Sequence, residues 1–259
     1  MKDLLHSRLS RRDILRYAAL GAGAIAVGSA CSTLPKTAPT LEQYKKQAEL
    51  TKNPIFRAAT VIVNSSAGMG HGGIFRDGDL YFMTQNHVMP DRSDKLKLVV
   101  PGLGATEFTL DSPWEVYPGE ADFDPNIRFR LSDGLREKLE GAIKAGVITP
   151  LSFYHDSLRS GDAFALPMPN NGKLSYLTYS EFHKDTNELE FDIENGYSCH
   201  GFSGTPVLKT DINKNLTTES IGLISSVAFD NKLFAGHKCS NTHAFIKPHL
   251  KWQISSPDN

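Results

Sequence analysis

The sequence has little of what would mark a nucleic-acid-binding, repetitive or disordered protein. Its 259 residues carry 28 lysines and arginines against 29 aspartates and glutamates, a formal net charge of -1. The basic residues are scattered, so no segment offers the positive field that nucleic acids require. There is no long Ser/Pro or Gln/Asn tract and no internal repeat. We therefore expect a globular protein that buries one good-sized core and has no nucleic-acid partner.

Long apolar runs are also missing, and the one weakly apolar stretch lies near the N-terminus. It runs over residues 17–30 and is too short to span a membrane. Before it stands Ser10-Arg11-Arg12-Asp13-Ile14-Leu15-Arg16, which resembles the twin-arginine export signal. We expect residues 1–30 to be an export signal that sends the protein to the periplasm or the cell exterior. An amphipathic N-terminal helix is the alternative.

Cysteine is scarce, and one of the three cysteines follows the apolar stretch directly. Gly28-Ser29-Ala30 has the small side chains that a signal peptidase needs, and Cys31 after it resembles the lipid-accepting cysteine of bacterial lipoproteins. Lipoprotein signals usually carry a branched apolar residue where Gly28 stands, so simple cleavage and lipidation of Cys31 both stay open. A membrane contact is expected only through this anchor.

Beyond a linker expected at residues 31–54, the chain becomes a series of short apolar runs separated by Gly, Asp and Asn. Asp77-Gly78, between two such runs, is a strong hairpin signal. Ten or more short strands without alternating helices predict an all-β protein with an antiparallel barrel or sandwich. The strands are expected at 60–63, 72–75, 80–84, 96–100, 114–117, 127–131, 163–166, 174–178, 189–193, 206–208, 221–226 and 243–246.

One segment, residues 133–145, is predicted to be helical. Ser132 can cap its start and Gly146 can end it. The apolar residues that share one face of this helix are Leu135, Leu139, Ala142 and Ile143. We expect a helical insertion that covers one end of a barrel, with control of access to a site as the alternative.

Two separated segments carry residues suited to nucleophilic catalysis. Ser203 stands in Gly201-Phe202-Ser203-Gly204-Thr205-Pro206-Val207, and His87 follows the apolar run that ends in Thr84. A serine needs a histidine folded against it as a base and a third group that orients the histidine. The glycines around Ser203 let the backbone N–H groups of Gly201 and Ser203 converge as an oxyanion hole.

With these two motifs, four separated segments resemble trypsin-like serine proteases, specifically the bacterial periplasmic branch that includes the high-temperature-requirement family. Residues 70–74 and 80–88 resemble the glycine-rich hairpin that leads into the family's histidine. Residues 158–162, followed by Ala165 and Pro169, resemble the strand that starts the second barrel. The resemblance covers most of residues 58–250.

The resemblance implies a chymotrypsin-like double antiparallel β-barrel over residues 55–259, with barrels at about 55–150 and 151–259. It implies an exported serine endopeptidase that works through an acyl-enzyme on Ser203, with His87 as the base. No cofactor is required, the partner is a peptide or protein substrate, and the expected state is a monomer.

The acidic member of the triad departs from the family pattern. In the family an aspartate directly precedes an apolar strand, whereas here Asn126 precedes Ile127. Asp124 is the first choice, because Pro125 could bring its carboxylate to the position of the family's aspartate. Asp122 is the second choice and Asn126 the third. An asparagine could orient the histidine but would stabilise its charged form less.

Two further positions bear on the function. Phe202 replaces the aspartate that digestive enzymes use to bind a freshly cut N-terminus, so we expect no activating cleavage beyond signal removal. The departures leave a non-catalytic homologue that acts as a binding module as the main alternative. An α/β-hydrolase esterase would need glycine two residues after the serine, where Thr205 stands.

The resemblance also implies a disulfide between Cys199 and Cys239 that braces the specificity pocket, two buried thiols being the alternative. His200, His237 and His243 lack the tight spacing of metal ligands, so no metal is expected.

Residues 223–227 resemble the strand edge to which a substrate backbone pairs. The pocket is expected near Ser225, Thr242 and His243. No carboxylate is evident there, so a basic substrate side chain is not favoured.

Overall fold

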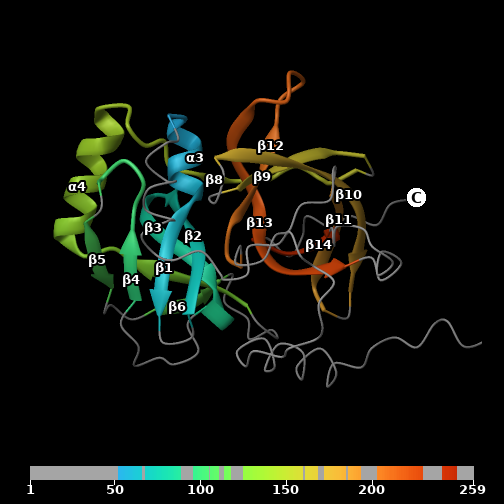
Figure 1. The fold of residues 1–259 in the computed structure, drawn as a ribbon, viewed down its shortest axis with the longest axis horizontal. Helices are drawn as coiled ribbons and strands as arrows, with labels where there is room; N and C mark the ends of the chain where they lie inside the picture. The colour runs from blue at the N-terminus through green and yellow to red at the C-terminus, as the bar shows by residue number, and fades with distance from the viewer. Residues whose placement is uncertain are drawn as a thin grey trace, which may run out of the picture. The chain divides into compact units, whose positions relative to one another are not determined.

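The computed structural model describes most of the chain after residue 51 (Figure 1). The described residues are 52–65, 68–88, 96–104, 106–110, 114–117, 125–159, 161–168, 172–184, 186–193, 203–229 and 241–249. The expected export signal, Cys31 and the expected linker up to residue 51 lie outside them. Within the described residues, no helix combines the length and the apolar character needed to cross a membrane.

The first barrel is a seven-stranded antiparallel sheet in the order β5-β4-β1-β2-β3-β7-β6. Hairpins and sequential neighbours dominate its pairing, as expected for strands joined by short turns. Its strands are β1 Val61–Ser65, β2 Gly68–Asp77, β3 Asp79–Gln85, β4 Leu96–Val99, β5 Glu107–Leu110, β6 Trp114–Tyr117 and β7 Asn126–Arg130.

The second barrel has the order β12-β9-β10-β11-β14-β13-β8. Because β12 also pairs with β13, the six strands from β12 to β13 form a closed ring, while β8 pairs with β13 in parallel. Its strands are β8 Ser152–Phe153, β9 Ala163–Met168, β10 Lys173–His183, β11 Glu188–Ile193, β12 Pro206–Thr210, β13 Leu216–Phe229 and β14 Asn241–Pro248. The predicted chymotrypsin-like double antiparallel β-barrel is confirmed.

The hairpin between β2 and β3 forms where Asp77-Gly78 predicted it. Asp77 pairs with Asp79, and Gly78 alone makes the turn with a φ of 72°, a conformation that favours glycine. All twelve expected strands are present, most of them longer than expected. Two further strands, β5 and β8, were not predicted from the sequence.

The helix α4, Asp133–Lys144, also forms as expected. Leu135, Leu139 and Ala142 are buried in the same cluster as the core of the first barrel, so α4 covers this barrel. Gly146 follows the helix with a φ of 69°. Ser132 occupies the N-cap position but makes no side-chain capping hydrogen bond, which corrects its expected role.

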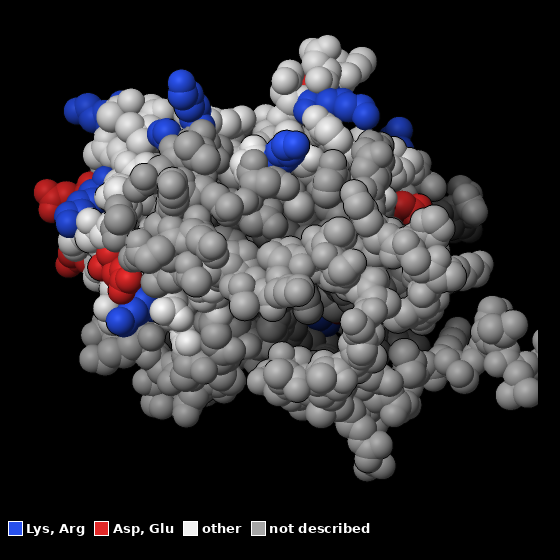
Figure 2. Space-filling view, viewed as in Figure 1, with Lys and Arg blue, Asp and Glu red and all other residues white. Residues whose placement is uncertain are grey.

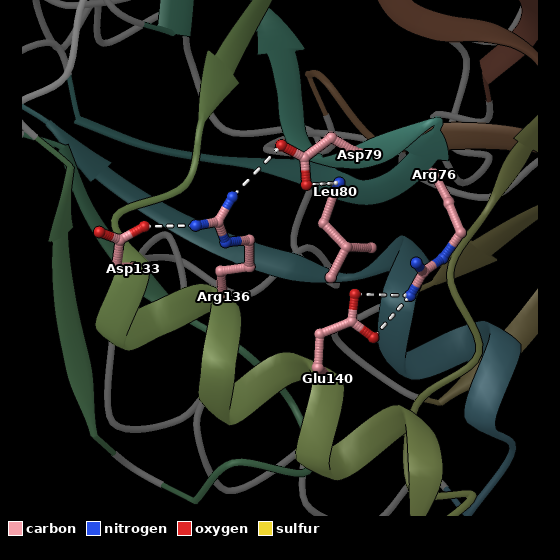
Figure 3. A network of polar contacts seen from close by, with 6 residues as sticks. All are labelled: Arg76, Asp79, Leu80, Asp133, Arg136 and Glu140. Carbon is pink, nitrogen blue, oxygen red and sulfur yellow. Dashed lines mark hydrogen bonds and ion pairs between the residues drawn. The ribbon is translucent and has the colours of Figure 1, made fainter.

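The exposed side of α4 is joined to the β2–β3 hairpin by ion pairs (Figure 3). Arg76 donates through Nη2 to both carboxylate oxygens of Glu140, at 3.0 and 2.9 Å. Arg136 contacts both Asp79, at 3.4 Å, and Asp133 of its own helix. These ion pairs link the exposed side of α4 to the hairpin, while the apolar face of the helix packs on the core of the first barrel.

A second helix, α3 Pro54–Ala59, was not predicted and begins at the end of the expected linker. Asn53 caps it by accepting hydrogen bonds from the backbone N–H groups of Ile55, at 2.9 Å, and Phe56, at 3.4 Å. Pro54 suits the first turn, where its missing N–H costs nothing. The helix contacts both β2 and β13, so it bridges the two barrels.

The barrels are also joined through the segment that connects them. Leu151 exchanges backbone hydrogen bonds with β2, accepting from Arg76 at 2.8 Å and donating to Ile74 at 2.9 Å. The next residues form β8, which pairs with β13. Five residues from strands of the second barrel are buried in the same apolar cluster as the first barrel's core: Phe153, Ala165, Leu208, Leu216 and Leu223.

Charge is spread thinly over the face shown in Figure 2. The described lysines and arginines, in blue, and the described acidic residues, in red, are dispersed on this face rather than gathered into one field.

Candidate active site

Ser203 begins a tight turn that leads into β12. Gly204, the second residue of this turn, has a φ of 83° and donates its N–H to the carbonyl of Ile224 at 2.9 Å. A Cβ at this position would lie 2.1 Å from the carbonyl oxygen of His71 and 2.5 Å from Oγ1 of Thr84. Glycine is therefore required after Ser203 by both the backbone conformation and the space.

The backbone of Ser203 is tied to the first barrel. Its carbonyl accepts a hydrogen bond from the N–H of His71, on β2, at 2.9 Å. The carbonyl of His71 in turn accepts from Oγ1 of Thr84, on β3, at 2.7 Å. His71 and Thr84 are buried, while Ser203 is half-buried. The turn of the second barrel thus rests on the two strands that lead to His87.

Gly70 shows how close the two segments come. A Cβ on Gly70 would lie 2.7 Å from Cγ1 of Val88 and 3.3 Å from the carbonyl oxygen of Ser203. The chain neighbour of His87 and the backbone of Ser203 therefore pack against the same glycine. Sequence reasoning did not find this role of Gly70, although it lies in the glycine-rich hairpin.

His87 itself lies in a single 3₁₀ turn, Asn86–Val88, directly after β3, and its side chain is exposed. The turn is held on one side by Ser65, whose Oγ donates to the carbonyl of Val88 at 2.6 Å. On the other side, the N–H of Asn86 donates to the carbonyl of Pro125 at 3.1 Å.

The Asn86–Pro125 hydrogen bond bears on the acidic member of the triad. Asp122 and Asp124 lie outside the described residues. Pro125, the residue directly after Asp124, is bonded to the residue directly before His87. Pro125 is therefore held beside the turn that carries His87, while the role of Asp124 stays a prediction.

Asn126, the third choice, is fully engaged elsewhere. Its Oδ1 accepts from Nε2 of Gln85 at 2.5 Å, and its Nδ2 lies 3.2 Å from the carbonyl of Lys247 and 3.3 Å from that of Pro248. The side chain is buried and joins β7 to the end of β14. Asn126 is thus a tie between the two barrels.

Two predicted pocket residues make contacts within the second barrel. Ser225 occupies a bulge of β13, and its Oγ lies within hydrogen-bond distance of two acceptors, Oε1 of Glu188 at 2.7 Å and the carbonyl of Phe245 at 3.1 Å. His243, on β14, places Nδ1 at 3.1 Å from both Glu190 Oε1 and Asp192 Oδ1. Thr242 lies on β14, but its side chain is outside the described residues.

The expected substrate edge is partly displaced. Leu223 pairs with β12 and with β14, and Ile224 also has backbone partners on both sides, so these two residues are not at an edge. From Ser226 to Phe229, the pairing in the described part of β13 is with β14 alone. The edge of β13 at residues 226–229, on the side opposite β14, is thus the candidate to which a substrate strand could add.

Gly201, Phe202 and the cysteines Cys199 and Cys239 lie outside the described residues. The expected oxyanion hole is described only at Ser203, and the expected disulfide stays a prediction.

A second serine and histidine meet in the structure, at the joint between the barrels. Oγ of Ser220 lies 3.0 Å from Nε2 of His249, and both residues are fully buried. The imidazole packs against the rings of Phe75 and Phe153, each with centroids 5.0 Å away. Burial lowers the pKa of His249 to about 3. Without access to a substrate, this pair is part of the core.

Comparison with known proteins gave likenesses of structure only, since a scan of protein-family models and a search of curated proteins each found no match. Kallikrein-related peptidase 10 aligns with a TM-score of 0.49 and 13% identity, over 77% of this chain and 93% of that one. The serine protease domain of the Sesbania mosaic virus polyprotein aligns with a TM-score of 0.44 and 11% identity, over 76% of this chain and 94% of that one. The tobacco vein mottling virus protease aligns with a TM-score of 0.45 and 11% identity, over 83% of each chain.

Proposed function

We propose that the protein is a serine endopeptidase in which Ser203 is the nucleophile and His87 the general base. Oγ of Ser203 attacks the carbonyl carbon of a peptide bond while its proton passes to His87. His87 gives this proton to the leaving amine as the C–N bond breaks, which leaves an acyl group on Ser203. Water, deprotonated by His87, then releases the carboxylic acid and restores the serine.

The observation that carries this proposal is the packing of two distant segments on Gly70. Val88 and the carbonyl of Ser203 lie on the same side of that glycine, and His71 and Thr84 fasten the Ser203 turn to the strands before His87. Ser203 is half-buried and His87 is exposed, so a substrate can reach both, unlike the buried pair of Ser220 and His249.

We assign the third role to Asp124, with Asp122 as the second choice. The hydrogen bond from Asn86 to Pro125 supports this assignment because it ties the residue after Asp124 to the residue before His87. A carboxylate there would hold the imidazole in the correct tautomer and stabilise its charged form.

The remaining parts of the site follow the same scheme. Gly201 and Ser203 supply the backbone N–H groups of the oxyanion hole, and a disulfide between Cys199 and Cys239 braces the pocket. A peptide substrate adds as a strand to residues 226–229 of β13, next to Ser225, Thr242 and His243.

The proposal extends to the cellular setting. The protein is exported through the twin-arginine signal in residues 1–30 and acts on peptides or proteins in the periplasm or outside the cell, with or without a lipid on Cys31. It acts as a monomer and resembles the protease domain of the high-temperature-requirement branch.

Labelling with a fluorophosphonate probe tests the proposal directly, because the probe reacts only with an activated serine. We expect the wild-type protein to be labelled and Ser203→Ala and His87→Ala to lose the label. Cleavage of fluorescein-labelled casein should fall about 10⁴-fold or more in both variants. Asp124→Asn should lower the rate by about 10⁴-fold, and Asp122→Asn should have little effect.

Ser157→Ala is the matched control, since Ser157 is an exposed serine outside the proposed site. It should be labelled like the wild type. A wild-type protein that stays unlabelled under both reducing and non-reducing conditions would leave the binding-module alternative as the better explanation.

A further inference from the structure

The outer face of the second barrel carries a cluster of two histidines and several carboxylates. In β11, Leu189, Phe191 and Ile193 are buried, so the alternate residues lie on the opposite face of the strand. This face also includes residues of the neighbouring strands β10 and β14. The residues concerned are Glu181, His183, Glu190, Asp192 and His243.

Glu190 is the centre of this cluster. Its Oε2 lies 2.5 Å from Nε2 of His183, and its Oε1 lies 3.1 Å from Nδ1 of His243. The Glu190 side chain is only 16% exposed, so solvent screens its charge far less than that of an open surface glutamate. Two imidazoles from two different strands therefore meet one largely buried carboxylate.

Two more carboxylates complete the group. Oε1 of Glu181 lies 3.6 Å from Nε2 of His183, and Oδ1 of Asp192 lies 3.1 Å from Nδ1 of His243. The ring of His183 also packs against that of Phe245, with centroids 5.7 Å apart, which restricts the imidazole. One atom each from Glu181, His183 and Glu190 lies within 4.8 Å of the others.

This spacing suits a metal ion. Four ligands placed about 2.0–2.2 Å from a tetrahedral Zn²⁺ are separated from one another by roughly 3.3–3.6 Å. The 3.6 Å separation between His183 and Glu181 fits that range, and the 2.5 Å separation between His183 and Glu190 is shorter, so a small side-chain rotation would bring the ligands into place. The combination of imidazole and carboxylate favours Zn²⁺ over Ca²⁺, which prefers oxygen ligands alone.

We propose that Glu181, His183 and Glu190 form a binding site for Zn²⁺ on the outer face of the second barrel. His243 lies outside the coordination sphere, with Nδ1 3.1 Å from the second oxygen of Glu190, and we expect it to influence the position of this ligand. The expectation of no metal considered His243 with His200 and His237, and did not consider His183. Glu181 and His183 are two residues apart on β10, and Glu190 joins them only through the pairing of β10 with β11.

The test is titration of Zn²⁺ into the metal-free full chain, purified without a histidine tag, by isothermal titration calorimetry. We expect about one Zn²⁺ per chain, and loss of this binding in His183→Ala and in Glu190→Gln. His243→Ala should weaken the binding by about 10-fold, the effect expected for a residue that orients a ligand. Bound Zn²⁺ should also raise the melting temperature of the wild type but not of the two ligand variants.

His155→Ala is the control, since His155 is an exposed histidine outside the cluster. It should bind Zn²⁺ like the wild type. The proposal is overturned if the wild type binds no Zn²⁺, or if His183→Ala and Glu190→Gln bind it as tightly as the wild type. The measurement needs no catalysis, so its outcome is independent of the roles of Ser203 and His87.

Discussion

The family resemblance made Asn126 a candidate to orient His87, whereas in the structure its side chain bonds to Gln85, Lys247 and Pro248. Its amide donates to two carbonyls of β14 and accepts from Gln85, so a carboxylate at this position would face two oxygens without a proton to share. We expect Asn126→Asp to lower the free energy of unfolding by at least about 2 kcal/mol, which denaturation in urea would measure.

Asn213→Asp is the matched control, because Asn213 is exposed in a turn, and its stability should stay within about 0.5 kcal/mol of the wild type. If Asn126→Asp instead kept its stability and cleaved peptides faster, Asn126 would be the residue that orients His87.

At the scale of single residues, the sequence offers hypotheses for residues whose role depends on chemical type. A serine among glycines and a histidine after an apolar run suggest catalytic roles before folding is known, and these roles stay predictions. The role of Asn126 depends instead on Lys247 and Pro248, which lie 121 and 122 residues away. No local pattern contains that information. The cluster around Glu190 was missed for the same reason, because three strands supply it.

At the scale of elements, α4 shows which contacts hold a helix on a barrel. Leu139 is fully buried in the first core, whereas the Arg76 and Glu140 side chains are 39% and 47% exposed. We expect Leu139→Ala to lower the free energy of unfolding by about 2–5 kcal/mol and Glu140→Gln by less than about 1 kcal/mol. Chemical denaturation of both variants checks the order.

Salt separates the two contributions further. The small effect of Glu140→Gln should shrink at high ionic strength, while that of Leu139→Ala should persist. An effect of Glu140→Gln as large as that of Leu139→Ala would show that the ion pairs in Figure 3, rather than the apolar face, hold the helix.

Elements with a clear local sequence pattern could be predicted. Elements that form only because they pack or pair with distant segments could not. The apolar spacing of α4 and the Asp77-Gly78 turn each specify a structure locally. β8 has only two residues, too few for any alternation, and exists because it pairs with β13. α3 has six residues, and its position between β2 and β13 provides much of the contact that such a short helix needs.

At the scale of the whole molecule, the joint between the barrels is a mixed apolar and polar layer. Leu151 links β2 to the start of β8, Asn126 links β7 to β14, and His249 lies between Phe75 and Phe153. Because Ser203 comes from the second barrel and His87 from the first, this layer also sets the geometry of the proposed active site. A condition that weakens the joint should weaken catalysis as well.

Acid is such a condition, because of His249. Its pKa is about 3 in the folded protein and near 6.5 in the unfolded chain, so between these values the unfolded chain binds the additional proton. Stability must therefore fall as the pH is lowered below about 6.5, by up to about 1.4 kcal/mol per pH unit from this group. Urea denaturation from pH 7 to pH 4 should show this loss in the wild type and in His155→Ala, and a smaller loss in His249→Gln. The same pH dependence in all three proteins would mean that His249 is not kept neutral at the joint.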